Sequence, residues 1–350
     1  MTLAATGSEP SIRSRHAVGI WLLSVAAVIL AMITVGGLTR ITGSGLSITE
    51  WDPILGAIPP LSDAQWHDAF AKYQRIPQYI RENQGMSLAA FKGIFWWEWA
   101  HRLLGRLLGA IFLVPFVWFA WTGAIKRSEW PRMVLLFALG GLQGFVGWWM
   151  VESGLETRVS VSQYRLAIHL GVALILLVAI LWTALEYLRR PPGAIRIGAA
   201  HAGWAGAMAI LVYFQMLLGA LVAGLHAGLL YNTWPLMDGR VLPEDAFAQS
   251  PWWLNLFENP GIAQFDHRML AYVIAVVAVF VGHGARRRNG WTRFSGLRVL
   301  NVTLLQLFLG IATLLLQAPE FLAAAHQLTA ALLLCTAVWH VFELRYAESA

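Results

Sequence analysis

The segment VGIWLLSVAAVILAMITVGG, residues 18–37, contains twenty residues and no charged side chain. About twenty apolar residues are needed for a helix to cross the hydrocarbon core of a bilayer. Seven further apolar runs of similar length follow, at residues 103–125, 134–151, 166–185, 203–225, 269–285, 299–317 and 321–342. We therefore predict an all-α polytopic membrane protein with eight transmembrane helices.

The composition of the whole chain agrees with this prediction. Of its 350 residues 58% are hydrophobic and only 13% are charged, whereas soluble proteins have about 25% charged residues. These values exclude a soluble enzyme and a disordered chain. The single cysteine, Cys335, excludes disulfide scaffolds and cysteine-ligated zinc or iron–sulfur sites. The net charge is +6, but the basic residues lie in short clusters between apolar runs, so we expect a lipid bilayer and no nucleic acid as partner.

The basic residues also predict an orientation. Of the 25 Lys and Arg residues, 14 lie at the termini and in the connections after the second, fourth and sixth spans. By the positive-inside rule both termini are cytoplasmic, and the long loops 38–95 and 226–264 lie outside. The first of these loops contains SDAQWHDAFAKY, residues 62–73, in which Ser62 and Gln65 resemble a capping box. This segment is either a short amphipathic helix on the outer surface or a simple tether.

The first and last four spans are related by an internal repeat. The matching pairs are residues 37–51 with 220–234, Gln143-x-Phe145-x-Gly147 with Gln306-x-Phe308-x-Gly310, HRLLG (101–105) with HRMLA (267–271), and His169 with His326. The repeat predicts two four-helix bundles related by a pseudo-twofold axis, one in residues 1–197 and one in 198–350. The spacings Gly105-xxx-Gly109 and Gly140-xxx-Gly144 predict close helix contacts.

Four histidines stand at the outer ends of the even-numbered spans and are expected at one depth: His101, His169, His267 and His326. Ionisable residues within membranes are costly and usually functional. Two imidazoles on facing helices of a bundle suit the axial coordination of haem iron. Zinc is less suitable because no Cys, Asp or Glu completes a tetrahedral set in both halves. A proton relay remains open, although it does not explain the pairing.

Three neighbouring side chains extend this pattern. Arg102 and Arg268 directly follow two of the histidines, where they either reach haem propionates or extend to lipid headgroups. Glu98 lies three residues before His101, and the equivalent position in the second half is Gln264. The difference suggests acid–base or cation-stabilising chemistry in the first half and an electron-transfer haem in the second. Alternatively, Glu98 only orients His101.

Several motifs together resemble the haem A synthase family. They are ITGSGLSITEW (41–51), EWAHRLLGR (98–106), His169, YNTWPLMDG (231–239), DHRMLAY (266–272) and HQLTA (326–330). The resemblance implies successive hydroxylation of a methyl group of haem O to the formyl group of haem A, with water as the oxygen source, for cytochrome oxidase assembly. It implies a catalytic Glu98, a substrate haem at His101, His169 and Arg102, and a haem b cofactor at His267, His326 and Arg268.

The resemblance also implies a setting for the chain. It places the protein in the bacterial inner (cytoplasmic) membrane with its haem sites toward the periplasm, and it makes a haem O synthase an expected partner; a homo-oligomer stays open. Some family members carry a cysteine pair in the first outer loop, which this chain lacks.

Two other classes of membrane protein agree less well with the sequence. A dihaem b-type cytochrome or quinone oxidoreductase stacks two haems on helices with two histidines each, but the second and fourth spans have no second histidine. A transporter predicts polar groups near the middle of the membrane, where these spans are apolar.

Overall fold

The computed structural model describes residues 11–189 and 203–346. Eight of its helices are long and apolar enough to cross a membrane, and the described residues contain no β-strand. They are α1 (Ile12–Ile41), α4 (Leu88–Trp121), α5 (Trp130–Leu155), α6 (Gln163–Arg189), α7 (Gly203–Gly224), α9 (Pro260–Arg286), α10 (Gly290–Leu315) and α11 (Glu320–Tyr346). The prediction of an all-α polytopic membrane protein is confirmed.

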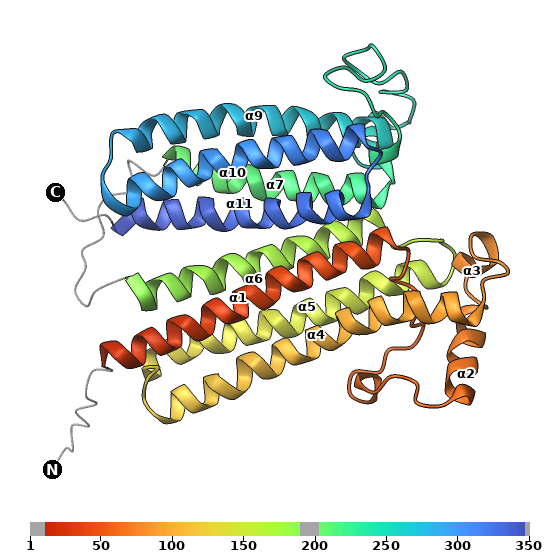
Figure 1. Cartoon of the computed structure of the whole chain (residues 1–350), viewed down its shortest axis with the longest axis horizontal. Helices are drawn as coiled ribbons and strands as arrows, with labels where there is room; N and C mark the ends of the chain where they lie inside the picture. Colours follow the sequence, from red (N-terminus) through yellow and green to blue (C-terminus); the bar gives the residue numbers. More distant parts are fainter. Residues whose placement is uncertain (1–10, 190–202, 347–350) are drawn as a thin grey trace.

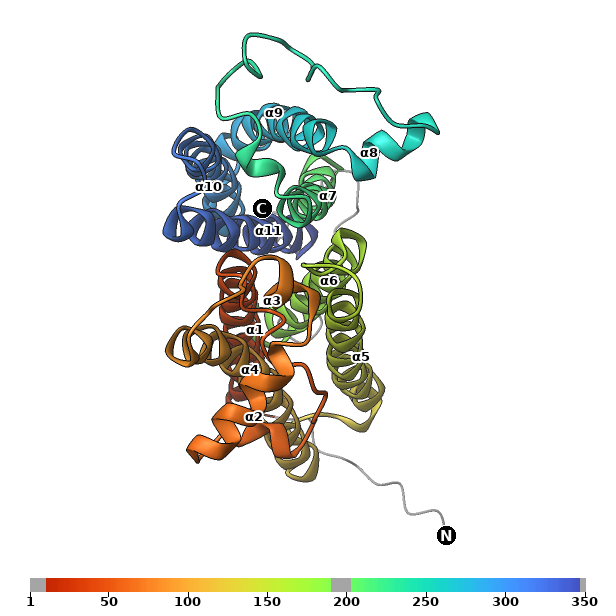
Figure 2. The same ribbon diagram turned by 90° about the vertical axis from the view of Figure 1, so that its right-hand side faces the viewer.

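These helices lie in two groups of four (Figures 1 and 2). The first helix group consists of α1, α4, α5 and α6, and the second helix group of α7, α9, α10 and α11. The groups meet where α1 packs on α11 and α6 packs on α7 and α11. The predicted division between residues 197 and 198 lies outside the described residues.

The apolar core lies along the interface between the two helix groups. Fully buried side chains come from both groups, among them Leu22, Leu177, Met208 and Leu334. By contrast, most side chains of α4, α5 and α10 are not buried within the protein, as expected for helices that face lipid. The inner helices therefore hold the two groups together, and the outer helices border the membrane.

The second long helix begins at Leu88, well before the predicted span at 103–125. Its first turns pack against α2 (Asp63–Tyr73), which has the capping box predicted at Ser62 and Gln65. Trp66 and Tyr73 of α2 join Phe91 and Phe95 of α4 in a separate apolar cluster. The helix interpretation of this segment is confirmed. Helix α4 thus extends beyond the predicted span on its N-terminal side, through Glu98 and Arg102, which form an ion pair within the helix.

Shorter elements occupy the connections. They are η1 (Leu55–Ala57), α3 (Pro77–Arg81), η2 (Arg127–Glu129), η4 (Ala227–Leu229), η5 (Trp252–Leu254) and α8 (Asn255–Glu258). Except for η2, all of them lie in the two long loops, at the end of the bundle where α1 ends and α11 begins (Figure 1).

The predicted glycine contacts in the first group were mostly wrong. A Cβ atom placed on Gly109, Gly140 or Gly144 would meet no atom within 4 Å, and one on Gly105 would meet only Met32. Close helix approaches occur at other glycines, among them four that face the four histidines.

Candidate functional site

Each of the four histidine rings packs against a glycine of another helix in its own group. A Cβ atom on these glycines would lie 3.0 Å (Gly36 to His101), 2.9 Å (Gly147 to His169), 3.2 Å (Gly219 to His267) and 2.8 Å (Gly310 to His326) from the ring Cε1 atom. Because carbon atoms normally pack at about 3.5–4.0 Å, a larger residue at these positions would require the ring or the helix to move. We call each pair a glycine contact.

A glutamine accompanies three of these glycine contacts, four residues before the glycine. The Nε2 atom of Gln143 lies 3.1 Å from His169 Nδ1, that of Gln215 lies 3.1 Å from His267 Nδ1, and that of Gln306 lies 3.0 Å from His326 Nδ1. The amide nitrogens of Gln143 and Gln306 also lie 3.4 Å from the ring Nε2 atoms of His169 and His326. Gln143 and Gln215 also donate to the backbone carbonyl of their histidine, at 2.9 Å in both cases. In the motif Gln143-x-Phe145-x-Gly147, the glutamine and the glycine thus contact the same histidine, which the repeat alone did not reveal.

His101 differs from the other three histidines. Met32 stands four residues before its glycine, Gly36. The Nδ1 atom of His101 is buried and has no hydrogen-bond partner within the described part of the chain. The ligand candidates are therefore not equivalent.

The second helix group brings its two histidines together. The ring centroids of His267 and His326 are 6.4 Å apart, with the ring planes at 71°. This separation is close to that of two imidazoles on opposite sides of one metal ion, given metal–nitrogen bonds of about 2 Å. His101 and His169 do not form such a ring pair among the described residues.

The donor set fits haem iron better than zinc. Across residues 11–189 and 203–346, no group of three or more His, Cys, Asp or Glu side chains is arranged to hold a metal ion. Two imidazoles suffice for haem, whose porphyrin supplies the other four ligands, whereas zinc requires four from protein or solvent.

Glu98 is buried in the first helix group and engaged by four donors. Its Oε1 atom accepts from Arg102 Nε at 3.0 Å and Nη2 at 2.6 Å. Its Oε2 atom accepts from Ser47 Oγ at 2.7 Å and from the backbone N–H of Ile48 at 2.8 Å. All four partners are donors, which is the set that an ionised carboxylate accepts.

Arg102 also fixes the first outer loop, and Arg268 does the same for the second. Arg102 donates to the carbonyls of Ile48 and Glu50 at 2.7 and 2.9 Å. Arg268 donates to the carbonyls of Tyr231 and Thr233 at 2.7 and 3.0 Å. These four carbonyls stand at equivalent positions of the repeat.

The residue four positions before each arginine in this network differs between the groups, being Glu98 in the first and Gln264 in the second. Gln264 accepts from Arg268 at 3.1 Å, as Glu98 does from Arg102, but its amide nitrogen donates to the carbonyl of Ala227 at 2.9 Å. Both arginine head groups lie inside the protein instead of extending to lipid headgroups. Contact between these arginines and haem propionates stays a prediction.

Other histidines do not provide a second ligand pair. His340 is buried and hydrogen-bonded to Ser295 Oγ at 2.9 Å, and His283 lies beside Arg287 on α9 at 3.1 Å. In the second outer loop, Arg40 donates to His226 Nε2 at 2.8 Å. Burial, together with the charge of Arg40, lowers the pKa of His226, so this contact favours a neutral imidazole.

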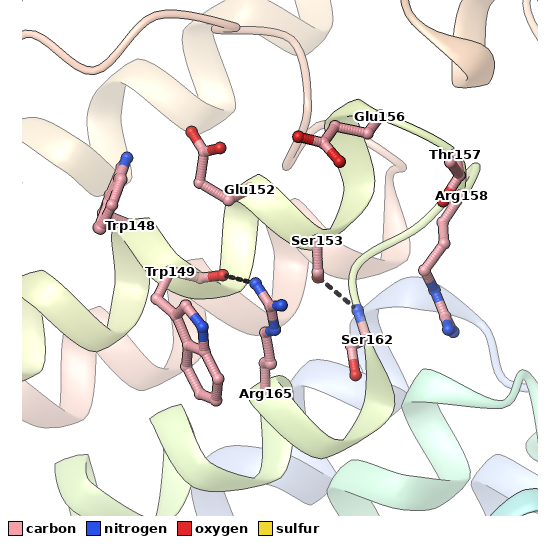
Figure 3. A pocket seen from close by; sticks show the side chains of 9 residues that line it. All are labelled: Trp148, Trp149, Glu152, Ser153, Glu156, Thr157, Arg158, Ser162 and Arg165. Atoms are coloured by element: carbon pink, nitrogen blue, oxygen red, sulfur yellow. Dashed lines mark hydrogen bonds between the residues drawn. The ribbon is translucent and has the colours of Figure 1, made fainter.

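Two cavities lie at the outer end of the first helix group. The larger one, of about 520 Å³, is open and is lined at the α5–α6 connection by Trp148, Trp149, Glu152, Ser153, Glu156, Thr157, Arg158, Ser162 and Arg165 (Figure 3). Arg165, one helical turn before His169, donates to the carbonyl of Trp149 at 2.6 Å and was not singled out from the sequence. The smaller cavity, of about 70 Å³, touches Gly36 and Leu166 and so lies beside the His101 contact.

Comparison with known proteins agrees with this arrangement. The family model described as cytochrome oxidase assembly protein matches residues 19–338. A protein of Parvibaculum lavamentivorans named Heme A synthase is 48% identical over 336 residues, which cover 96% of both chains. A protein of Brucella ovis with the same name is 51% identical over 343 residues, covering 97% of this chain and 94% of its relative.

Proposed function

The chain belongs to the family of cytochrome oxidase assembly proteins, and on that premise we propose that it is a haem A synthase. The proposed reaction oxidises a methyl group of haem O to a formyl group by successive hydroxylation. With water as the oxygen source, the conversion of the methyl group to the formyl group releases four electrons and four protons to an acceptor. The observation that carries the proposal is the close pair of His267 and His326 in the second helix group, together with a buried carboxylate, Glu98, three residues before His101 in the first.

The second helix group is the proposed site of the haem b cofactor. His267 and His326 would hold its iron, supported by their 6.4 Å separation and their glycine contacts. Arg268 would border the cofactor together with the loop that it fixes. When bound, haem b supplies an electron-transfer group to this half of the protein.

The first helix group is the proposed site of the substrate. His101 and His169 would ligate the iron of haem O, and Arg102 would hold the outer loop beside it. Glu98 is the proposed catalytic residue. Because four donors stabilise its ionised form, we assign it stabilisation of positive charge that develops on the substrate in preference to proton donation.

The proposed location is the bacterial inner membrane, with both termini cytoplasmic and the haem sites toward the periplasm. The distribution of Lys and Arg supports this orientation. In addition, α1 begins and α11 ends at the end of the bundle opposite α2 and α3 (Figure 1). A haem O synthase is the proposed source of the apolar substrate.

The extracted pigments of the purified protein test the proposal. We expect haem b together with haem O or haem A, whereas haem b alone would indicate an electron-carrying b-type cytochrome.

Glu98→Gln should keep the haem b spectrum and abolish haem A formation, and normal haem A formation by this variant would refute the catalytic assignment. His267→Ala should lose haem b, with the exposed His283→Ala on the same helix as the matched control; retention by His267→Ala would contradict the cofactor assignment.

A further inference from the structure

Three of the four histidines are contacted by both members of a Gln-xxx-Gly pair on another helix. Residues four apart share one face of a helix, so both side chains of the pair address the same imidazole. The glycine admits the ring, and the glutamine reaches its Nδ1 atom. The arrangement recurs in both helix groups, in Gln143 with Gly147, Gln215 with Gly219 and Gln306 with Gly310.

Each of these glutamines has an amide oxygen without a partner. The Oε1 atoms of Gln143, Gln215 and Gln306 are buried, and no donor is found for them among the described residues. A buried acceptor without a donor costs about 1–3 kcal/mol, so it points to a donor that another state of the site supplies.

Iron ligation supplies that donor. An imidazole that binds a metal through Nε2 carries its proton on Nδ1, and that N–H is normally donated to an oxygen acceptor that fixes the ring. Rotation of the glutamine side chain, rather than an exchange of its amide atoms in place, brings Oε1 to the Nδ1 side of the ring. The amide nitrogen now lies 2.9 Å from the histidine carbonyl at His169 and His267, and 3.4 Å from the ring Nε2 at His169 and His326. The histidine carbonyl that loses the amide N–H keeps its partner in the helix.

We propose that Gln143, Gln215 and Gln306 are positioning residues that accept the Nδ1–H of His169, His267 and His326 when these histidines ligate iron. This inference rests on the proposed function, because it requires iron at the histidines. It goes further by assigning an orienting partner to three ligands and none to the fourth.

The position that corresponds to these glutamines beside His101 distinguishes the proposed substrate site from the proposed haem b site. Met32 replaces the glutamine at His101, and a thioether is only a weak acceptor. The Nδ1 atom of His101 consequently has no partner. Both haem b ligands are oriented, whereas the substrate site has one oriented ligand, His169, and one unrestrained ligand, His101. His101 is therefore the ligand from which the substrate haem would be released.

Exchanges at Gln215 test the orienting role through the midpoint potential of haem b. A stronger acceptor at Nδ1–H makes the imidazole a better donor and favours ferric iron. Gln215→Glu should therefore lower the potential, and Gln215→Met should raise it and weaken haem b retention by about 10-fold. A purely structural role does not produce shifts of opposite sign. Shifts of the same sign, or none, would overturn the inference; Gln306→Glu and Gln306→Met repeat the test on the other ligand if a Gln215 variant does not fold.

The converse exchange tests His101. Met32→Gln should slow the loss of haem O or haem A from the purified protein during detergent washing by about 10-fold, while leaving the haem b potential unchanged. Unaltered retention would overturn the assignment of His101 as the releasing ligand. These outcomes are distinct from failure of the proposed function, in which the unmodified protein itself would contain no haem O or haem A.

Discussion

Replacement of Gly310 by alanine tests whether the glycine contacts determine haem b binding. The new Cβ atom would lie 2.8 Å from His326 Cε1, whereas carbon atoms need about 3.5 Å. The ring or helix α10 must therefore move by about 0.7 Å, more than the roughly 0.5 Å within which binding groups must be held. Such overpacking costs about 1–3 kcal/mol, so we expect haem b affinity to fall by roughly 5- to 150-fold.

The same geometry predicts a graded series within the second helix group. At Gly219 the Cβ atom would lie 3.2 Å from His267 Cε1, so a movement of about 0.3 Å is enough and Gly219→Ala should have a smaller effect than Gly310→Ala. Gly284→Ala on α9 is the control, because its Cβ atom would meet nothing within 4 Å. Without a clash, alanine in place of glycine should stabilise the helix by up to about 1 kcal/mol.

The assay is the haem b content per protein after purification, measured together with the thermal unfolding midpoint. Haem b should decrease in the order Gly284→Ala, Gly219→Ala, Gly310→Ala. Full haem b occupancy in Gly310→Ala, or equal loss in all three variants, would refute the argument from ring contacts.

Three further predictions concern the junction of the helix groups and the outer loops. Gly37→Ala should lower the unfolding free energy by about 1–3 kcal/mol, because its Cβ atom would overlap the side chain of Gln327; adding Gln327→Ala should restore most of the loss in thermal unfolding. Arg268→Lys should speed proteolysis of the second outer loop, because lysine cannot donate to both loop carbonyls with the geometry of a guanidinium, and an unchanged cleavage rate would contradict this role. His226 should make the folded state less stable at low pH, because burial and the charge of Arg40 lower the pKa of its imidazole in the folded protein. Its contribution to the unfolding free energy is present above about pH 6.5 and is lost as the pH falls through the folded pKa. His226→Gln should remove this part of the pH dependence of the unfolding midpoint, and an unaltered dependence would show that another group is responsible.

The membrane architecture could be predicted from the sequence because it depends on local composition. Each apolar run is long enough to span a bilayer irrespective of its neighbours, and all eight predicted spans correspond to helices. The start of α4 could not be predicted in this way. Arg102 and Arg106 interrupt the apolar run, but Arg102 donates to Glu98, and both arginines donate to backbone carbonyls of a distant loop.

The candidate site could be predicted only in part. The repeat indicated Gln143 and Gly147 through their matching letters in α10, but not what they contact. Gln215 was missed because its counterpart in the repeat is Met32, so no identity marks the position. The contacts of Arg268 were hidden because its partners are carbonyl groups, which every residue has.

The differences between the helix groups converge on one side chain. The arginine contacts to the loops and the glycine contacts to the rings are the same in both groups, so they serve what both sites share. The site differs between the groups at Glu98 against Gln264 and at Met32 against Gln215. Glu98 lies three residues before His101, and Met32 lies four residues before Gly36, the glycine that contacts His101. A carboxylate one turn away suits a site that must stabilise developing positive charge. An imidazole without an orienting partner suits a site that must then release its product. An amide and an oriented imidazole suit a cofactor that stays bound. The chemical division between the groups therefore depends on the surroundings of His101, and the exchange of Met32 and Gln215 tests it more directly than removal of any ligand.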